Sequence, residues 1–474
     1  MAASVLMWER GGWLLVTGSL LASATLHGGE APLRAPTLTV EVEETVYAYE
    51  DRGGAGPLWT RSNHCIIRMG DTLFVSGTES LPTRAPWNNT RWFLLKHDGK
   101  TWSRIADGGE THEREPCPIV AFDDGRLFLS TNPNECGPQE RDGTAHPQVL
   151  EFLPAKQGGR YSTLIPEWQR PFRAVGHTYR SFVSDAPNNE FILFHPDDHK
   201  VHWAFYSRDR WVAQGEFAYP YEAKYETPQT IRVSYPPMQI RNRAVHLCGK
   251  MNIIEPVGAW LKYKKEVLGR TWNYACRRMF YTWTDDITAD EFHPWVELAN
   301  WDEYAGWVIP CDLWLDADDR AHILWCEDTV HPGLRDAFFP EAKRRRAFAY
   351  AIVEDGKVVS RKAIEEWHEG EPGPVPNRNA RFHETPAGRL YVLYNVADKE
   401  TPDYVLENRI VEIDPRTGAV GPAVTVPLDV PLSDYYTAGV RGGSKPSLVI
   451  DVLGLHNPYP KERPVRYVRI RLQE

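Results

Sequence analysis

The sequence predicts an all-β fold, a seven-bladed β-propeller of four-stranded antiparallel blades with short helical inserts. The first observation behind this prediction is composition: aromatic residues make up 12% of the 474 residues, and 35 Gly and 37 Pro accompany them. This mixture is typical of many short strands joined by tight turns. The second observation is an internal repeat of seven strand pairs, and the third is an aromatic strand that follows most of these pairs.

Each repeat consists of an apolar alternating run, a turn, and a second apolar run, which is the pattern of a β-hairpin. The turns carry Asp, Asn or Gly, as in Gly70-Asp71 of the first repeat and Asp124-Gly125 of the second. The seven predicted pairs are 64–67 with 73–75, 118–120 with 127–129, 179–183 with 191–193, 235–240 with 245–247, 308–315 with 321–325, 380–383 with 390–393, and 436–440 with 448–452.

A third, aromatic-rich strand follows most hairpins, at 91–95, 201–206, 278–283 and 348–353. A fourth strand completes each unit. Because one four-stranded sheet cannot bury both faces, a ring of seven is favoured, since it packs each sheet between two others and leaves only short edges. A pair of β-sandwiches or a β-helix would use the same strands, although a β-helix needs shorter and stricter repeats.

Two stretches have helical composition, around 256–265 and around 341–346, and we predict them as inserts in loops between strands.

The N-terminus resembles a secretory signal peptide. Arg10 precedes an apolar stretch at 13–21, and Ala22-Ser23-Ala24 fits a cleavage site. We therefore predict a signal peptide at 1–24, one propeller domain at 25–474, and a secreted or periplasmic protein; the alternative is a translation start placed upstream of the true one. No other stretch approaches the roughly 18 to 20 apolar residues of a membrane span, so no span is expected.

Charge and cysteine content exclude several classes of protein. With 54 basic and 64 acidic residues the net charge is −10, so no nucleic-acid partner is expected. The seven Cys show neither a disulfide framework nor zinc spacing. Nucleotide-binding and serine-hydrolase functions are excluded because there is no Gly-rich phosphate loop and no Gly-x-Ser-x-Gly turn.

We predict no cofactor and no metal ion in the functional site. One segment carries ligand types that suit a structural zinc or calcium ion, and the same residues are typical of a polar hairpin turn. These residues are His195, Asp197, Asp198, His199 and His202.

Several short motifs resemble a known family. Asp-Gly-Lys-Thr-Trp at 98–102 resembles a shortened Asp-box turn of the bacterial neuraminidase repeat. His177-Thr-Tyr179 and Ser234-Tyr235-Pro236 open the third and fourth repeats. Together these motifs resemble the neuraminidase-repeat-like propellers that include ulvan lyases.

The resemblance implies a polysaccharide lyase whose site contains two His, a Tyr and an Arg. It places the first His at His177, the second at His199 and the Tyr at Tyr235. The position of the Arg falls near Lys250, so the family pattern is not complete. The motifs cover the third and fourth repeats only, so the fold transfers more safely than the activity.

Basic residues are frequent just before the predicted innermost strands, where a propeller binds its ligand at the mouth of the central channel. A guanidinium group suits carboxylate or sulfate, so these residues favour an anionic ligand. Several could instead pair with Glu115 or Asp312. The predicted substrate-binding residues are Arg61, Arg114, Arg180, Lys250, Arg378 and Arg381, with Arg232 nearby and with Trp307 and Tyr435 for stacking on sugars.

β-Elimination at a uronate requires a cation on the carboxylate, a base for the neighbouring proton and an acid for the leaving oxygen. We predict His177 and Tyr235 as base and acid in either order, Arg180 or Arg61 on the carboxylate, and His64 in support. The leading hypothesis is thus an exported lyase acting on an anionic polysaccharide or oligosaccharide, sulfated or not. The alternatives are a sialidase-like or other glycoside hydrolase using Asp312 and Tyr436, and a glycan-binding propeller without activity.

Overall fold

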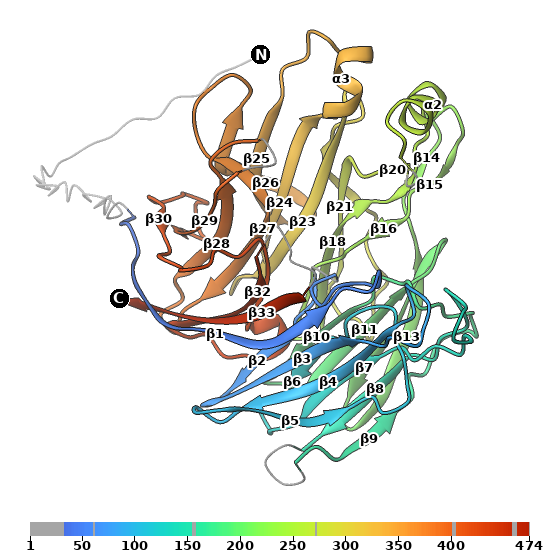
Figure 1. Ribbon diagram of the computed structural model, residues 1–474, viewed down its shortest axis with the longest axis vertical. Coiled ribbons are helices and arrows are strands. Elements are labelled where there is room, and N and C mark those ends of the chain that lie inside the picture. The colour runs from blue at the N-terminus through green and yellow to red at the C-terminus, as the bar shows by residue number, and fades with distance from the viewer. Residues whose placement is uncertain are drawn as a thin grey trace, which may run out of the picture. The chain divides into compact units, whose positions relative to one another are not determined.

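The computed structural model describes residues 33–59, 62–153, 158–270, 273–400, 404–456 and 462–473. The chain divides into two units, Met1–Pro32 and Leu33–Glu474, and all described residues belong to the second. The predicted signal peptide at 1–24 therefore lies outside the described residues. The second unit is a seven-bladed propeller of four-stranded antiparallel sheets, which confirms the predicted fold class (Figure 1).

The blades follow one another along the chain, and each begins with its innermost strand. Blades 1 to 3 are β2 (Ile66–Met69), β3 (Thr72–Ser80), β4 (Thr90–His97) and β5 (Trp102–Asp107); β6 (Ile119–Ala121), β7 (Leu127–Thr131), β8 (Gln148–Phe152) and β9 (Tyr161–Leu164); and β10 (Ser181–Asp185), β11 (Glu190–Pro196), β12 (Lys200–Ser207) and β13 (Arg210–Ala218). Blade 4 is β17 (Met238–Arg241) with β16 (Val233–Ser234), then β18 (Ala244–Met251), β21 (Arg278–Thr284) and β22 (Val296–Asn300).

Blades 5 and 6 are β23 (Ala305–Leu315), β24 (Ala321–Val330), β25 (Arg345–Glu354) and β26 (Lys357–His368); and β27 (Val375–Glu384), β28 (Leu390–Ala397), β29 (Leu406–Ile413) and β30 (Val424–Thr425). Blade 7 is β31 (Asp434–Thr437), β32 (Val449–Leu455), β33 (Glu462–Gln473) and β1 (Thr37–Glu50). Two short ladders lie outside the blades, β14 (Tyr221–Glu222) with β15 (Gln229–Thr230) and β19 (Ile253–Ile254) with β20 (Tyr274–Ala275).

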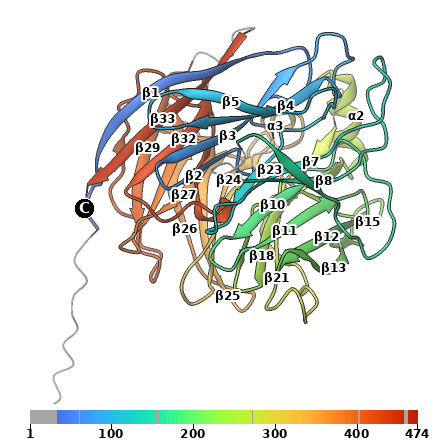
Figure 2. The same ribbon diagram turned by 90° about the horizontal axis from the view of Figure 1, so that it is seen from below.

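The ring closes because the first strand of the chain completes the last blade. β1 pairs with β33 in antiparallel register, and Figures 1 and 2 show the blue and red strands side by side. Ion pairs cross this seam, from Glu41 to Arg469 at 3.1 Å and from Glu43 to Arg466 at 3.0 Å. The innermost strands then contact one another around the ring, β2–β6–β10–β17–β23–β27–β31 and back to β2.

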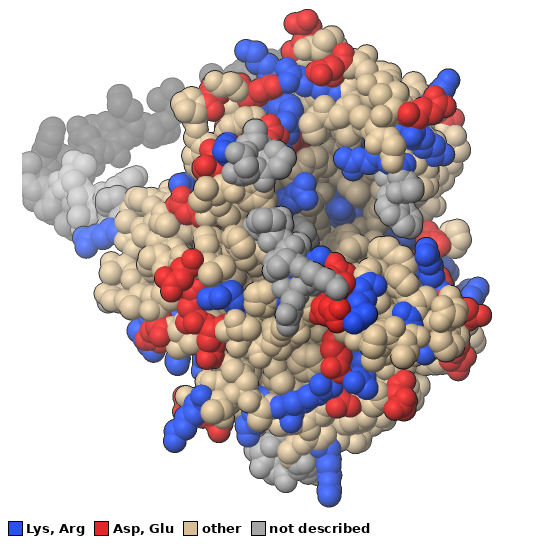
Figure 3. Space-filling model, in the orientation of Figure 1, with Lys and Arg blue, Asp and Glu red and all other residues tan. Residues whose placement is uncertain are grey.

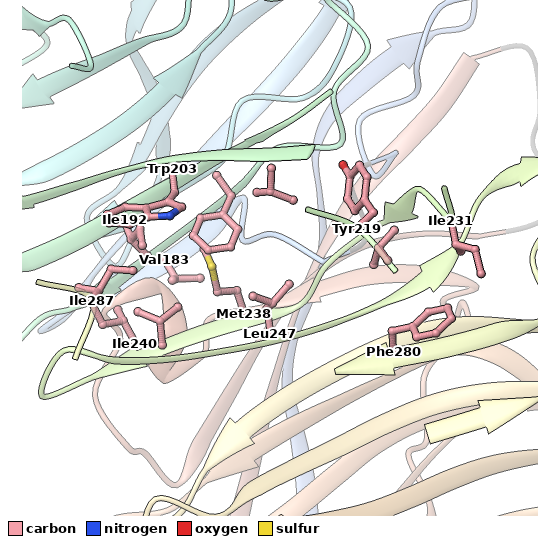
Figure 4. Close-up of a cluster of buried hydrophobic side chains, with 14 of the residues drawn as sticks. Val183, Ile192, Trp203, Tyr219, Ile231, Met238, Ile240, Leu247, Phe280 and Ile287 are labelled. Carbon is pink, nitrogen blue, oxygen red and sulfur yellow. The ribbon is translucent and has the colours of Figure 1, made fainter. Parts of the chain in front are cut away.

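The core consists of apolar layers between neighbouring blades. Figure 4 shows one of them, in which Val183 and Ile192 of blade 3 belong to one buried cluster with Met238 and Leu247 of blade 4. Full burial of such a side chain contributes about 1.5–3 kcal/mol. Each sheet therefore depends on both neighbours for its burial, as the repeat pattern predicts.

All seven predicted hairpins are present, and the seventh differs in one detail. Its inner strand ends at Thr437, three residues early, because Val440–Gly442 form a 3₁₀ turn, η1, that contacts β6, β10 and β17. The turn brings Arg441 into the channel. Among the described residues no helix is long and apolar enough to cross a membrane.

One helical insert is confirmed and the other is wrong. The segment 256–265 contains α2 (Gly258–Glu266), but the second helix, α3 (Pro332–Phe338), precedes the predicted segment 341–346. There Arg344 binds Asp328 and Arg345 binds Glu327. Both partners belong to β24, so the basic run leads into the extended strand β25 beside it.

Candidate functional site

A cavity of about 460 Å³ lies at the end of the channel where the innermost strands begin. Its lining comes from distant parts of the chain: Trp59 precedes β2, Tyr235 precedes β17, Asp434 begins β31, and Lys250 and Arg463 come from β18 and β33. Figure 3 shows a hollowed face with side chains of Lys or Arg inside the hollow. The ring thus gathers aromatic side chains, two cations (Lys250 and Arg463) and two carboxylates (Asp51 and Asp434) that no single blade contains.

Aromatic rings lie in a row beside this cavity. Tyr179 packs between His177 and Tyr235, with ring centroids 4.4 Å and 4.3 Å away, and Trp59 lies 6.4 Å from His177 on the far side. Tyr179 and Tyr235 both have positive φ, 54° and 53°, which is uncommon for a side chain of this size. Such backbone is retained only where the surroundings hold it.

Glu115 holds one of these two turns. Its Oε1 accepts hydrogen bonds from the backbone N–H groups of Thr178 (3.0 Å) and Tyr179 (3.1 Å). The carboxylate is buried and lies 3.6 Å from Nη1 of Arg180. A carboxylate from the start of blade 2 therefore fixes the segment that carries His177 and Tyr179.

Three cations surround the aromatic row. Lys250 Nζ lies 5.0 Å from the centre of the Tyr235 ring. The Arg232 guanidinium lies 5.3 Å from the centre of the Tyr179 ring. Arg114 Nη2 is 3.1 Å from His177 Nδ1. We call His177, Tyr179, Tyr235, Arg114 and Lys250 the channel-mouth cluster.

The surroundings of His177 determine its charge. Burial, together with repulsion from the Arg114 and Arg232 guanidinium groups, lowers the pKa of His177 to about 3. The imidazole is therefore neutral at neutral pH. Burial also raises the pKa of Tyr179, so that its hydroxyl keeps its proton.

Arg378 and Trp307 lie beside a second cavity, of about 290 Å³, which Asp434 shares with the first. The Arg378 guanidinium is 5.6 Å from the Trp307 ring centre, and that of Arg346 is 5.4 Å from it. These two predicted residues are thus near the first cavity but outside the channel-mouth cluster.

Four predicted residues lie inside the channel wall, away from a ligand in either cavity. His64 is 3% exposed and its Nδ1 donates to the Thr437 carbonyl. Arg180 and Arg381, 1% and 2% exposed, donate to backbone carbonyls of neighbouring strands or loops. The Tyr435 hydroxyl is within hydrogen-bond distance of two backbone carbonyls. Their burial places them away from both cavities, so their predicted roles stay predictions, and Arg61 lies outside the described residues.

His199 does not join the cluster either. It is exposed in the turn between β11 and β12, where its backbone N–H donates to Asp197 Oδ1. His202 Nε2 lies 2.9 Å from Asp197 Oδ2, so this segment is an ordered polar turn. His195 is buried next to Phe172, at 5.3 Å between ring centroids. Within the described ranges, no three His, Cys, Asp or Glu side chains form a group that could hold a metal ion.

Asp312 and Tyr436, predicted for a glycoside hydrolase, are also buried. Asp312 binds Arg441, which also donates to the backbone carbonyls of Ser62 (3.2 Å) and Met238 (3.0 Å). The Arg441 guanidinium thus links the inner ends of blades 1, 4 and 5. Asp312 lines, with His64 and Arg441, a cavity of only about 20 Å³, which is too small for a sugar.

Sequence reasoning missed several residues of the site. Tyr179 stands two residues after His177 in a motif that the sequence does single out, but only the backbone shows that its ring separates His177 from Tyr235. Asp434 and Arg463 line the cavity from blade 7, and no pattern in their surroundings distinguishes them from other surface charges.

Comparisons with known proteins identify the fold and not the family. No family model matches this sequence, and no curated protein matches it either. Similar solved structures include the polysaccharide lyase Uly1 (TM-score 0.50, 8% identity, 94% of this chain and 100% of that one). A protein of unknown function from Dyadobacter fermentans is also similar (TM-score 0.43, 10% identity, 92% of this chain and 100% of that one). So is an α-L-arabinofuranosidase of Fusarium graminearum (TM-score 0.39, 10% identity, 74% of this chain and 91% of that one). At such identities the similarity shows the fold alone, and the resemblance to neuraminidase repeats stays a prediction.

Proposed function

We propose that the protein is a carbohydrate-active enzyme, a polysaccharide lyase that cleaves a uronate-containing glycan by β-elimination at the 460 Å³ cavity. The observation that carries this proposal is the pairing of Tyr235 and Lys250 on one cavity wall, 5.0 Å apart, with His177 behind Tyr179. A solved polysaccharide lyase with the same fold supports the choice among carbohydrate enzymes.

The reaction needs three functions at one sugar. A base removes the proton next to the carboxylate, the electron pair forms a carbon–carbon double bond, and the bond to the glycosidic oxygen breaks while an acid protonates that oxygen. The Lys250 ammonium is the cation that would stabilise charge on the carboxylate. Tyr235 and His177 are the proton carriers of the cluster.

The cavity lining contains two carboxylates as well as two cations, but Asp51 is paired with Arg463, and Lys250 favours an anionic substrate. Among the described residues, neither Lys250 nor Arg114 has a carboxylate partner within 4.0 Å, whereas the buried Arg180 has two. A cation next to a cavity without such a partner retains its capacity to bind a ligand anion. We also propose that the protein is secreted or periplasmic, because such polysaccharides lie outside the cell and the N-terminus resembles a signal peptide.

The test uses the full-length protein on a panel of uronate polysaccharides, with and without sulfate. We expect ultraviolet absorbance from the new double bond, and losses of about 10²–10⁴-fold in kcat/KM for Tyr235→Phe and Lys250→Met. Tyr221→Phe and Lys445→Met change exposed residues away from the cavity and serve as matched controls.

Two results would contradict the lyase. New reducing ends without the absorbance would indicate a hydrolase. Binding of the glycan without any turnover, unchanged in the Tyr235 variant, would indicate a glycan-binding propeller.

A further inference from the structure

The two ring nitrogens of His177 have different surroundings. Nδ1 lies 3.1 Å from Arg114 Nη2. A guanidinium group has five N–H donors and no acceptor, and it stays protonated in proteins. The hydrogen bond therefore requires Nδ1 to accept, so in a neutral ring the single proton is on Nε2.

The other nitrogen is buried without a partner. His177 Nε2 has no hydrogen-bond partner among the described residues, and its nearest rings are those of Tyr179 and Trp59. A buried donor without an acceptor costs about 1–3 kcal/mol. This unsatisfied N–H lies next to the side chains that line the cavity, where an acceptor of a bound ligand would compensate for it.

We propose that Arg114 fixes the tautomer of His177, with Nδ1 unprotonated and the proton on Nε2, so that His177 acts as a hydrogen-bond donor and not as the base. The tautomer is a property of the free protein alone. The role of His177 as a donor and not as the base rests on the proposed lyase function.

The sequence predicts His177 and Tyr235 as base and acid in either order, and the tautomer of His177 distinguishes their roles. Nε2 already carries its proton and Nδ1 is occupied by Arg114, so neither nitrogen can take up a further proton without breaking that contact. Proton abstraction then falls to the Tyr235 oxygen, which lines the cavity beside Lys250. The proton moves from the sugar carbon to that oxygen, the electron pair forms the double bond, and the bond to the glycosidic oxygen breaks, while the hydroxyl proton of Tyr235 passes to the leaving oxygen.

The first experiment measures the tautomer directly, in the full-length protein without substrate. Two-dimensional 1H–15N spectra of the protein labelled at histidine distinguish a protonated from an unprotonated ring nitrogen, and loss of signals in His177→Gln assigns the residue. We expect protonated Nε2 and unprotonated Nδ1 at neutral pH. A proton on Nδ1, or a doubly protonated ring, would overturn the proposal.

Arg114→Met and Arg232→Met form a matched pair for this measurement. Both remove a positive charge near His177, but only Arg114 donates to the ring, since Arg232 lies over Tyr179. We expect mixed tautomers in the Arg114 variant and the wild-type tautomer in the Arg232 variant. An unchanged tautomer in Arg114→Met would contradict the role of Arg114.

The second experiment tests donor against base by activity. Glutamine places an N–H near the position of Nε2 but cannot act as a base. His177→Gln should therefore lose clearly less activity than His177→Leu, which should lose about 10–150-fold, as for a lost hydrogen bond to a charged group. Equal loss in both variants would show that His177 is the base.

The two proposals fail separately. The expected tautomer in a protein without lyase activity would refute the proposed function and leave the action of Arg114 intact. Lyase activity with a proton on Nδ1 of His177 would support the proposed function and refute the action of Arg114.

Discussion

Glu113 is a buried carboxylate whose ionisation should oppose folding, and Glu113→Gln tests this. The Arg180 guanidinium lies near two buried carboxylates, at 3.9 Å from Glu113 and 3.6 Å from Glu115. Burial raises the pKa of Glu113 to about 7 from an ordinary value of 4.5, although Arg180 opposes the change. The single positive charge of Arg180 cannot balance the negative charges of both Glu113 and Glu115.

The sign follows from proton binding. Below pH 4.5 the folded and unfolded states both hold the Glu113 proton; as pH rises toward 7 the unfolded state releases it first, so stability falls. A pKa shift of this size lowers the free energy of unfolding by about 3 kcal/mol, and the loss is complete by about pH 8. Glutamine does not titrate and can still accept the Asn132 N–H bond. The variant should therefore gain about 3 kcal/mol relative to wild type across this range.

Urea unfolding at a series of pH values measures this difference. Glu371→Gln, at an exposed position, is the control and should show no such trend. A stability difference between Glu113→Gln and wild type that does not change between acidic and alkaline pH would refute the reasoning.

Two further predictions concern the channel. Arg441→Met leaves the buried Asp312 carboxylate without its cation, so we expect a loss of about 3–5 kcal/mol in urea unfolding, partly restored by adding Asp312→Asn; a loss below about 1 kcal/mol, as for an exposed pair, would contradict this. Gly443→Ala adds a Cβ 2.2 Å from the Ala121 carbonyl oxygen at φ +96°, so the melting temperature should fall by the equivalent of about 1–3 kcal/mol, and an unchanged value would show that the turn relaxes.

Local patterns predicted the strands because a hairpin depends on residues close in the chain. The turn at Gly70-Asp71 and the apolar runs around it are visible within about a dozen residues, and β2 and β3 follow them. The segment 341–346 shows where this reasoning ends. Its composition favours a helix, but Arg344 and Arg345 bind Asp328 and Glu327 of the neighbouring strand, and that tertiary contact decides its conformation.

The sequence by itself determined the number of blades and the end of the channel at which charged residues gather. Positions just before the innermost strands predicted that His177 and Tyr235 lie at one end of the ring, and the family resemblance added Lys250. In the structure Tyr235 and Lys250 line one cavity.

Only the tertiary structure decided how deeply each charged side chain is buried and with which group it pairs. Arg114 and Arg180 both lie within a few residues of an innermost strand, but Arg180 is enclosed with two carboxylates while Arg114 reaches His177 at the mouth. The partners in each case lie about sixty residues away along the chain. Charge type and spacing are local properties, whereas burial and partner choice depend on which segments the closed ring brings within a few ångströms, and no window of sequence contains that information.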